Sequence, residues 1–358
     1  MNDILNHILL TGGAGYIGSH IAVNLIEQGF KVTLFDSFIN SRKLIIKNIK
    51  NLIIKKCPEN LKNLEIFEGD IRDINSILKV FALAKDNNQL FTGVIHLAGL
   101  KAVGESVENP LKYWESNVYG SINLFKVMDS NKCKTIIFSS SATIYNPTHQ
   151  IKIKENFDIN PSNPYGSTKV AIERILMDVS NSSPNEWKII NLRYFNPIGA
   201  DPSGLLGELP LGKPNNIFPI ILDVALDNSK KLNIYGNDWD TKDGTGIRDY
   251  IHVSDLSNGH VIALKFLLEN NPQYINLNLG TGKGTSVLEL IKTFENSNKV
   301  TVPFVISKRR LGDVSYTVAD NNLAKGLLNW HPKKSLSEMC VDGWRWKLNL
   351  SKNINKLG

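Results

Sequence analysis

The sequence predicts an α/β protein with a doubly wound parallel sheet. Short apolar runs that look like buried strands recur through the first half of the chain, at residues 8–10, 32–35, 64–67, 94–97, 135–138 and 189–192. Helix-length stretches lie between these runs, at residues 17–28, 111–130 and 165–179. Strands that alternate with helices are typical of βαβ units, whose parallel sheet is covered on both faces. Beyond residue 194 the alternation weakens, and residues 197–219 and 236–246 predict long loops.

Length and composition leave room for two domains and exclude several classes of protein. The chain has 358 residues, of which 42% are hydrophobic and 21% charged, so wholesale disorder is excluded. Its formal charge is +7, but no basic run is interleaved with aromatic residues, so we expect a solvated basic surface and no nucleic-acid partner. Cys57, Cys133 and Cys340 form no Cys-x-x-Cys pair, so we expect neither a disulfide framework nor a metal site.

The chain also lacks the marks of export or membrane insertion. Residues 1–10 include Asp3 and no basic leader, and their apolar run stops at Thr11. No stretch of about 18 apolar residues follows, so no membrane span is expected. We therefore expect a soluble, cytoplasmic protein.

A glycine-rich turn follows the first predicted strand and opens the first predicted helix. Its glycines have the spacing Gly12-x-x-Gly15-x-x-Gly18. In dinucleotide-binding folds the first glycine allows the tight turn, the second lets the backbone approach a pyrophosphate, and the third lets helix and strand pack closely. The N-terminus of the helix also faces the phosphates. The turn therefore predicts a Rossmann-type nucleotide site.

A carboxylate at the end of the second predicted strand indicates which dinucleotide binds. Asp36 lies 18 residues beyond Gly18, where a carboxylate accepts hydrogen bonds from a ribose 2′-hydroxyl and repels a 2′-phosphate. NAD is therefore favoured over NADP. Asp70 and Ile71 follow the third predicted strand and residues 98–99 follow the fourth, at the strand ends where open α/β sheets bind ligands.

A second constellation predicts hydride chemistry at an alcohol carbon. Tyr165 and Lys169 lie four residues apart at the start of a predicted helix, so they share one of its faces. An ammonium fixed beside a phenol favours the phenolate and lowers a pKa that is normally about 10. Upstream, the predicted strand 135–138 runs into the serines 139–141, and a serine hydroxyl at a strand end can bridge a sugar hydroxyl and the tyrosine.

Four longer strings carry a more specific resemblance. They are AGLKAVGES at 98–106, SSSATIY at 139–145, RYFNPIGA at 193–200 and DGTGIRDYIHV at 243–253. With the glycine turn and the tyrosine–lysine pair, they resemble the extended short-chain dehydrogenase/reductase family and, within it, the UDP-glucose (UDP-galactose) 4-epimerases. The similarity runs from about residue 8 to residue 346. It implies a non-metal isomerase that uses bound NAD to interconvert UDP-glucose and UDP-galactose through a 4-keto intermediate.

The resemblance also implies how the chain is divided. Residues 1–193, with a return segment near 250–280, would form the NAD-binding Rossmann domain. Residues 194–249 and 281–358 would form a smaller α/β domain that binds the UDP-sugar. A homodimer that packs through helices near 111–130 and 165–179 is expected on the same grounds.

The roles known in the family fall on particular residues of this sequence. Tyr165 would take the proton of the sugar 4-hydroxyl, Lys169 would tune the tyrosine and hold the nicotinamide ribose, and Ser141 would bond the sugar oxygen. The residues implied to contact NAD are Gly12, Gly15, Tyr16, Ile17, Gly18, Asp36, Ser37, Asn40, Ser41, Asp70, Ile71, Leu97, Ala98, Gly99, Lys101, Ser116, Ser139, Tyr165, Lys169 and Phe195. Those implied to contact the UDP-sugar are Lys101, Ser141, Tyr165, Asn196, Asn216, Ile217, Asn233, Tyr235, Arg248, Arg310, Asp313 and Thr317. Ser116 stands where asparagine is common, with Asn117 next to it.

Other functions on the same fold fit the sequence less well. A nucleotide-sugar 4,6-dehydratase typically has an Asp-Glu pair just after its catalytic serine or threonine, whereas this chain has Ser140, Ser141 and Ala142 there. An epimerase acting on UDP-glucuronate would need a cationic or polar clamp for the carboxylate, and the string at 100–102 resembles that of the neutral-sugar group. A non-catalytic dinucleotide-binding regulator would typically lose the tyrosine or the lysine, and both are present.

Substrate breadth depends on one position in the C-terminal part. In the family, the residue four past the Asp of Gly-Asp borders the pocket near the sugar 2-position, and a small residue there admits N-acetyl groups. Counting from Gly312-Asp313 puts Thr317 at this position. We therefore expect UDP-N-acetylglucosamine and UDP-N-acetylgalactosamine as further substrates. A slip of one residue would place Tyr316 there and reverse the expectation.

Overall fold

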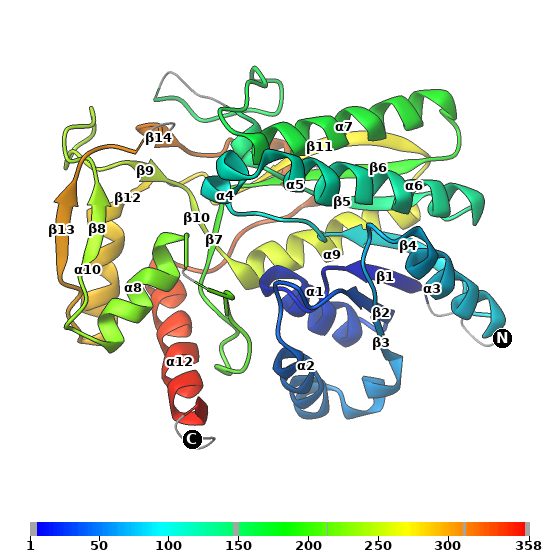
Figure 1. Ribbon diagram of the computed structural model, residues 1–358, viewed down its shortest axis with the longest axis horizontal. Coiled ribbons are helices and arrows are strands. Elements are labelled where there is room, and N and C mark those ends of the chain that lie inside the picture. The colour runs from blue at the N-terminus through cyan, green and yellow to red at the C-terminus, as the bar shows by residue number, and fades with distance from the viewer. Residues whose placement is uncertain (1–5, 146–149, 213, 311–312, 355–358) are drawn as a thin grey trace. The chain divides into compact units, whose positions relative to one another are not determined.

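The computed structural model describes residues 6–145, 150–212, 214–310 and 313–354, and the chain divides into two compact units (Figure 1). Unit 1 contains Met1–Ile144, Pro161–Arg193 and Ser257–Leu277. Unit 2 contains Tyr145–Asn160, Tyr194–Leu256 and Asn278–Gly358. Gly312, from which position 317 is counted, lies outside the described residues.

Unit 1 is built on a seven-stranded sheet with the strand order β11-β6-β5-β4-β1-β2-β3. The strands are β1 (His7–Thr11), β2 (Lys31–Asp36), β3 (Leu64–Glu68), β4 (Phe91–His96), β5 (Thr135–Ser141), β6 (Lys188–Tyr194) and β11 (Gln273–Leu279). The pairs β2–β3, β1–β2, β1–β4 and β4–β5 are parallel. The order of the strands reverses between β1 and β4, which is the switch point of a doubly wound sheet. The predicted fold class is confirmed.

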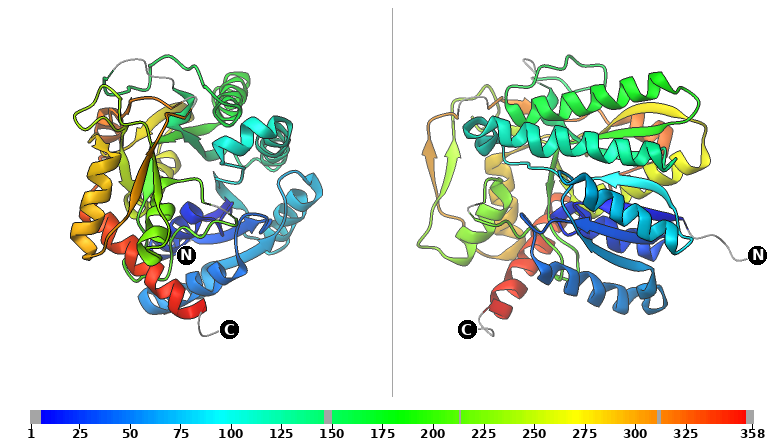
Figure 2. Two further views of the ribbon diagram at one scale, coloured as in Figure 1. Left: turned by 60° about the vertical axis from the view of Figure 1, so that its left-hand side comes forward. Right: turned by 45° about the vertical axis from the view of Figure 1, so that its right-hand side comes forward.

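Helices cover both faces of this sheet (Figures 1 and 2). The helical elements of this part are α1 (Tyr16–Glu27), α2 (Lys43–Lys56), η1 (Pro58–Asn63), α3 (Ile74–Asp86), α4 (Val103–Glu108), α5 (Pro110–Tyr113), η2 (Trp114–Tyr119), α6 (Gly120–Ser130), η3 (Ala142–Ile144), α7 (Pro164–Ser182) and α9 (Val253–Glu269), whose first turn belongs to unit 2. On one face, Val80 of α3, Leu124 of α6 and Ile172 of α7 pack in a single buried cluster with the sheet. On the other, Leu264 of α9 lies beside Gly93 of β4.

Burial on both faces explains why continuous apolar runs mark these strands in the sequence. Every residue of β1, β2 and β5 is buried. A strand with helices on both sides has no solvent face, so its residues need not alternate between apolar and polar. The predicted strands therefore coincide with β1 to β6, within a few residues at each end.

The turn after β1 brings two loops into close contact. Gly12 has a φ of +69°, in the left-handed region that favours glycine. A Cβ at Gly12 would lie 2.8 Å from the amide nitrogen of Ala98, in the loop after β4. A Cβ at Gly18 would overlap the carbonyl oxygen of Gly12. The first helix can therefore pack against this turn only because both positions are glycine.

The predicted helix 111–130 contains a turn of π-helix. α5 leads into the π-helical η2, and α6 follows directly. A π turn accommodates one extra residue and is frequent at functional sites. Asn117 lies within it and is buried. The apolar spacing predicts the helix but not the π turn, because one extra residue shifts that spacing by less than a turn.

The described residues of unit 2 form three small sheets, β10-β7, β12-β9-β14 and β13-β8. Its elements are β7 (Asn196–Ile198), α8 (Ile217–Leu226), β8 (Leu232–Tyr235), β9 (Ile247–Arg248), β10 (Tyr250–His252), β12 (Thr285–Ser286), α10 (Val287–Asn298), β13 (Phe304–Ser307), β14 (Tyr316–Thr317), α11 (Asn322–Leu328) and α12 (Leu336–Ile354). Its core holds Phe218 of α8, Phe294 of α10 and Met339 of α12. α10 begins at a capping box, in which Ser286 and Glu289 bond each other's backbone amides.

Two absences hold for the part of the chain that the structure describes. There, no helix combines the length and the apolar character needed to cross a membrane. Within the same ranges, no three His, Cys, Asp or Glu side chains are grouped so that they could hold a metal ion. Cys57, Cys133 and Cys340 are buried free thiols.

A matched pair of glycine-to-alanine changes tests the glycine turn. Gly29 also has a positive φ, +84°, but a Cβ there would meet nothing within 4 Å. Gly29→Ala should cost only the left-handed backbone, about 1–2 kcal/mol of unfolding free energy. Gly12→Ala should cost about 1–3 kcal/mol more, because its Cβ also overlaps the Ala98 backbone. Chemical denaturation measures both losses, and equal losses would mean that the turn opens without penalty.

Candidate active site

Helix α7 carries the predicted tyrosine and lysine. It begins where the Asn163 side chain accepts a hydrogen bond from the Gly166 amide at 2.9 Å, with Pro164 in its first turn. Both residue types favour a helix start, because the first amides lack partners within the helix and proline has no amide hydrogen to satisfy. Tyr165 and Lys169 follow one turn apart, and both are buried. The helix therefore places both side chains on its inner face.

The end of β5 meets this face of α7. The Lys169 ammonium donates to the Ser139 carbonyl oxygen at 2.8 Å. The hydroxyls of Tyr165 and Ser141 are hydrogen-bonded to each other, and Ser141 also accepts from the Thr143 hydroxyl at 3.0 Å. The structure thus brings together Ser141, Tyr165 and Lys169, three side chains that the sequence predicts to act jointly.

Burial governs the charge of the two α7 side chains. It raises the pKa of Tyr165 to about 12, against a smaller lowering by the Ser141 hydrogen bond. It lowers the pKa of Lys169 to about 8, and the Glu173 carboxylate partly offsets this shift. The ammonium lies 5.7 Å from the centre of the Tyr165 ring. At neutral pH, therefore, Tyr165 is a neutral phenol beside a cation that favours the loss of its proton.

The turn after β1 has the features that a dinucleotide needs. Gly15 brings no side chain to the first amides of α1, so an anion can approach them. The Asp36 carboxylate accepts from the Ala14 amide at 2.9 Å and from the Ser41 hydroxyl at 2.8 Å. A carboxylate has about four acceptor positions, so Asp36 can hold the turn and also accept from a ribose hydroxyl. Together with the close approach allowed by Gly12 and Gly18, these residues fit NAD.

Other predicted cofactor residues lie in the loops after β2, β3 and β4. Arg72 binds the Asp70 carboxylate through Nε and NH2 and holds the pKa of this carboxyl below its usual range. The amide of Ala98 donates to the Thr11 hydroxyl at 3.3 Å, which ties the loop after β4 to β1. Members of the predicted set that are half-buried are Gly12, Gly15, Tyr16, Ile17, Ser37, Ser41, Asp70, Leu97, Ala98 and Ser116. Those that are exposed are Asn40, Gly99 and Lys101.

Asn117 is a buried neighbour of the predicted Ser116. Its side chain accepts from the Leu100 amide at 2.7 Å and donates to the Leu100 carbonyl and the Thr168 hydroxyl, each at 3.0 Å. Thr168 in turn donates to the Tyr165 carbonyl at 2.7 Å. Asn117 therefore ties the loop after β4 to the first turn of α7. Its sequence signal is weak: it stands one residue past the position where the family commonly has asparagine, and contact of Ser116 with NAD stays a prediction.

His96, at the end of β4, was not among the predicted residues. Its Nδ1 lies 2.7 Å from the Thr11 hydroxyl and its Nε2 2.9 Å from the Ser121 hydroxyl. Burial lowers the pKa of His96 to about 3, so the imidazole is neutral at physiological pH. It ties β1 and α6 together beneath the loops. A lone histidine at the end of an apolar run gives no sequence signal for such a role.

In unit 2, four of the predicted UDP-binding side chains gather together, and two of them are arginines. The Arg310 guanidinium lies 4.6 Å from the centre of the Tyr235 ring and binds Asp313 at 3.0 Å. Arg248 is on β9, and burial lowers the pKa of its guanidinium against the opposing charge of Asp313. Two forked donors close to one carboxylate suit a diphosphate, because guanidinium groups bind phosphate oxygens in a bidentate manner.

The remaining predicted substrate residues of unit 2 are more dispersed along the chain. Asn233 of β8 accepts from the Ser307 hydroxyl at 3.3 Å. Asn216 begins α8 and donates to Glu208 at 3.1 Å, with Ile217 next to it. Asn196 lies opposite Tyr250 in the β7–β10 pair. Its neighbour Phe195, which is predicted to contact NAD, donates its amide to the Leu279 carbonyl at 3.2 Å. Their contacts with a ligand stay predictions.

Strand β14 places Tyr316 and Thr317 on opposite faces. In its parallel pairing with β9, Tyr316 lies opposite Ile247 and Thr317 opposite Arg248. A Cβ on Gly284 would contact both Ile247 and Tyr316, so the tyrosine ring packs on that side. Paired residues of neighbouring strands share a face, so Thr317 is on the same face as Arg248. This register supports Thr317 as the residue that borders the sugar.

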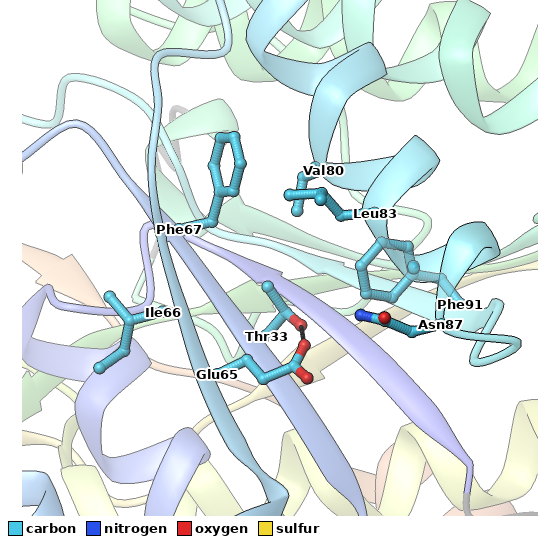
Figure 3. A pocket seen from close by; sticks show the side chains of 9 residues that line it. Thr33, Glu65, Ile66, Phe67, Val80, Leu83, Asn87 and Phe91 are labelled. Atoms are coloured by element: carbon cyan, nitrogen blue, oxygen red, sulfur yellow. Dashed lines mark hydrogen bonds between the residues drawn. The ribbon is translucent and has the colours of Figure 1, made fainter.

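A separate hollow in unit 1 lies away from these residues. Figure 3 shows this pocket of 280 Å³, which is lined by Thr33, Glu65, Ile66, Phe67, Val80, Leu83, Ala84, Asn87 and Phe91. The Thr33 hydroxyl donates to Glu65 at 3.0 Å across its floor. Thr33 and Glu65 lie in the first halves of β2 and β3, whereas Asp36 and Asp70 follow the other ends of these strands. The hollow is therefore not part of the candidate active site.

A dinucleotide turn on β1, and a tyrosine–lysine pair on α7 that faces a serine of β5, are the marks of a short-chain dehydrogenase/reductase. The second unit, with its own core, makes it one of the extended kind.

Comparisons with known proteins agree with this class. A family model described as GDP-mannose 4,6 dehydratase matches residues 9–342. A UDP-glucose 4-epimerase of Cyamopsis tetragonoloba is 46% identical over 339 residues, which cover 95% of this chain and 94% of the relative. The solved UDP-glucose 4-epimerase of Stenotrophomonas maltophila, with bound NAD and formylated UDP-arabinopyranose, is 41% identical with a TM-score of 0.90, covering 98% of this chain and 99% of that one. The solved UDP-glucose 4-epimerase of Bifidobacterium longum, in complex with NAD+ and UDP, is 40% identical with a TM-score of 0.88 and the same coverage, 98% and 99%. The chain belongs to this extended short-chain dehydrogenase/reductase family, among the UDP-glucose 4-epimerases.

Replacement of Lys169 tests its effect on the tyrosine. The guanidinium of Lys169→Arg stays charged, so the pKa of Tyr165 should lie about 1 unit or more lower in this variant than in Lys169→Met, whose phenolate has no neighbouring cation. The absorbance of the phenolate, taken as the difference from a Tyr165→Phe protein at each pH, measures the shift. Lys169 itself, with a pKa of about 8, is already neutral at the pH where the phenolate forms, so the two variants are compared with each other. Equal titrations in Lys169→Arg and Lys169→Met would contradict the assigned role of a cation beside Tyr165.

Proposed function

We propose that the protein interconverts UDP-glucose and UDP-galactose, with NAD as its cofactor. The buried set of Ser141, Tyr165 and Lys169, on a chain of this family, is the observation that carries the proposal. Relatives crystallised with NAD, and with UDP or a UDP-sugar, support the same cofactor and substrate class.

Three residues of unit 1 have separate roles in the reaction. Tyr165 takes the proton of the sugar 4-hydroxyl and later returns a proton to the oxygen of the 4-keto sugar. Bound NAD supplies the acceptor and then the donor of the hydride at C4. Lys169 is held by the Ser139 carbonyl and stabilises the Tyr165 phenolate, while the Ser141 hydroxyl holds the sugar oxygen. The configuration at C4 inverts because the keto sugar presents its other face before the hydride returns.

We assign the two ligands to different units. In unit 1, Gly12, Gly15 and Gly18 would hold the pyrophosphate of NAD and Asp36 a ribose, as the sequence predicts for residues 1–193. In unit 2, Arg248 and Arg310 would bind the diphosphate of the UDP-sugar. Each charge-assisted hydrogen bond of this kind is worth about 1.5–3 kcal/mol.

The dehydratase alternative is not favoured by the residues beside Ser141. Elimination of water across C5 and C6 of a sugar needs an acid and a base near those atoms. The Ser140 hydroxyl donates to Glu173, the Ser141 hydroxyl bonds Tyr165, and Ala142 has no polar side chain. None of these three can carry the second proton transfer.

We further propose a homodimer in the cytoplasm. Apolar side chains on one of the helices predicted to pair support the dimer, since Leu111 is 81% exposed, Trp114 39% and Tyr119 51%. Light scattering in solution measures the molar mass, and a monomer at micromolar concentration would contradict the dimer. The cytoplasmic location follows from the sequence-based expectation alone.

The decisive experiment is turnover of UDP-galactose by the purified protein with no cofactor added. UDP-glucose should form, and acid should release NAD from the protein. Tyr165→Phe should lower the rate about 10²–10⁴-fold, the usual contribution of a positioned general base. Tyr113→Phe is the matched control, because the Tyr113 hydroxyl bonds the Ala102 carbonyl and Glu105 and lies outside the assigned machinery. Near-normal turnover by Tyr165→Phe, or a requirement for added NADP, would contradict the proposal.

Thr317 makes N-acetylated sugars a second proposed substrate class, because it shares a face with Arg248. The unmodified protein should epimerise UDP-N-acetylglucosamine, measured by chromatography of the products. Thr317→Tyr should abolish this activity and spare UDP-galactose, because the larger ring fills the space for the acetyl group. Tyr316→Phe, on the other face of the strand, should change neither activity. No turnover of UDP-N-acetylglucosamine by the unmodified protein would contradict this substrate class.

A further inference from the structure

A buried ion pair lies one helical turn beyond Lys169. The side chains of Glu173 and Arg193 are 5% and 2% exposed. Arg193 donates to both carboxylate oxygens of Glu173, from Nε at 2.9 Å and from NH2 at 2.6 Å. Charges taken out of water are costly, and an apolar pair of similar volume is often at least as stable. Stability alone therefore does not account for this pair.

Glu173 of this ion pair also takes part in the contacts that join the end of β5 to α7. Tyr165, Lys169 and Glu173 are spaced four residues apart, so they lie on one face of α7 in successive turns. The last three residues of β5 bind them: the Ser141 hydroxyl binds Tyr165, the Ser139 carbonyl binds Lys169, and the Ser140 hydroxyl donates to Glu173 at 2.5 Å. With Arg193 on β6 holding its other side, the Glu173 carboxylate has a fixed place beside Lys169.

We infer that Glu173, held by Arg193 and Ser140, is a positioning residue that keeps Lys169 protonated and so determines the pH range in which Tyr165 acts as a base. The inference rests on the proposed function for the role of Tyr165. Glu173 itself touches neither the sugar nor the cofactor in this assignment, and acts through Lys169.

Electrostatics gives the direction of the effect. Burial lowers the pKa of Lys169 to about 8, and the charge of Glu173 is what opposes it. Charges interact more strongly in a buried site than in water, because the local dielectric constant is lower. Removal of the negative charge should make Lys169 lose its proton at lower pH, and the Tyr165 phenolate then loses the cation that stabilises it.

The other titratable groups that pack around this face keep one charge state near neutral pH. His96 of β4 is neutral, because burial lowers its pKa to about 3. Burial also raises the pKa of Tyr274 of β11 to about 12 and that of Tyr113 of α5 above its ordinary value. Arg193 of β6 stays cationic. A titration near neutral pH can therefore be attributed to Lys169.

The test is the isosteric change Glu173→Gln. The carbon-13 chemical shift of the Lys169 Cε, assigned in lysine-labelled protein as purified by comparison with Lys169→Arg, should titrate about one unit lower than in the unmodified protein. The pH profile of kcat/KM for UDP-galactose should move to lower pH by a similar amount. A purely structural role would lower the rate or the melting temperature without moving either titration.

Two further variants make the test specific. Ser140→Ala removes one hydrogen bond to the same carboxylate but keeps its charge, so the titration should stay in place. The double variant Glu173→Gln with Arg193→Met leaves no unpaired buried cation, which protects the fold, and should still titrate low, because the charge that acts on Lys169 is that of Glu173. An unchanged or raised titration in both Glu173 variants, or an equal shift in Ser140→Ala, would overturn the inference.

Failure of the inference and failure of the proposed function are distinguishable. The Lys169 titration needs no substrate, so it decides the role of Glu173 even in a protein without turnover. A protein that does not convert UDP-galactose would contradict the proposed function alone.

Discussion

Lys169 must lose its water shell without losing its proton, and the arrangement of β5 and α7 meets this requirement. A buried ammonium needs acceptors and negative charge close by, or it becomes neutral. The Ser139 carbonyl supplies the acceptor at 2.8 Å, and the Phe138 ring lies 4.9 Å from the ammonium. These contacts exist only if the end of the strand and the start of the helix are held in one register. The cap at Asn163 and the π turn that carries Asn117 fix that register from the helical side.

The nucleotide turn depends on a second constraint, the close approach of backbone at the carboxyl ends of the strands. Thr11 shows how the loops are joined there, since its carbonyl accepts from the Leu97 amide and its hydroxyl from the Ala98 amide. Asp36 joins β2 to the same turn through the Ala14 amide. Because these contacts involve backbone atoms, side chains at Gly12 and Gly18 would separate the loops. The floor of the nucleotide site is therefore made mostly of main chain.

The sequence predicts the first half of the fold well because the signals there are local. Burial on both faces leaves continuous apolar runs. The glycine turn and Asp36 both lie inside one strand–helix–strand unit, which runs from β1 to the end of β2. Glu173 and Arg193 could not be paired in the same way, since a charged residue in a helix usually faces solvent and the two come from separate elements. Asn117 and His96 were missed for a related reason: their partners come from other elements, and nothing beside them in the chain reports the contact. In unit 2, strands such as β9 and β14 have two residues each, too few to show any periodicity.

The division of the chain has a consequence for its synthesis on the ribosome. Unit 1 takes three separate segments, and the last of them, Ser257–Leu277, carries most of β11. That strand is the edge of the sheet beside β6. Until residue 277 has left the exit tunnel, a nascent chain holds a six-stranded sheet with β6 as an open edge. Residues Tyr194–Leu256 of unit 2 have by then already been synthesised, but Asn278–Gly358, the last segment of the same unit, has not. Open strand edges pair readily with other chains. The interval between the synthesis of β6 and that of β11 is therefore when a growing chain most needs protection by a chaperone.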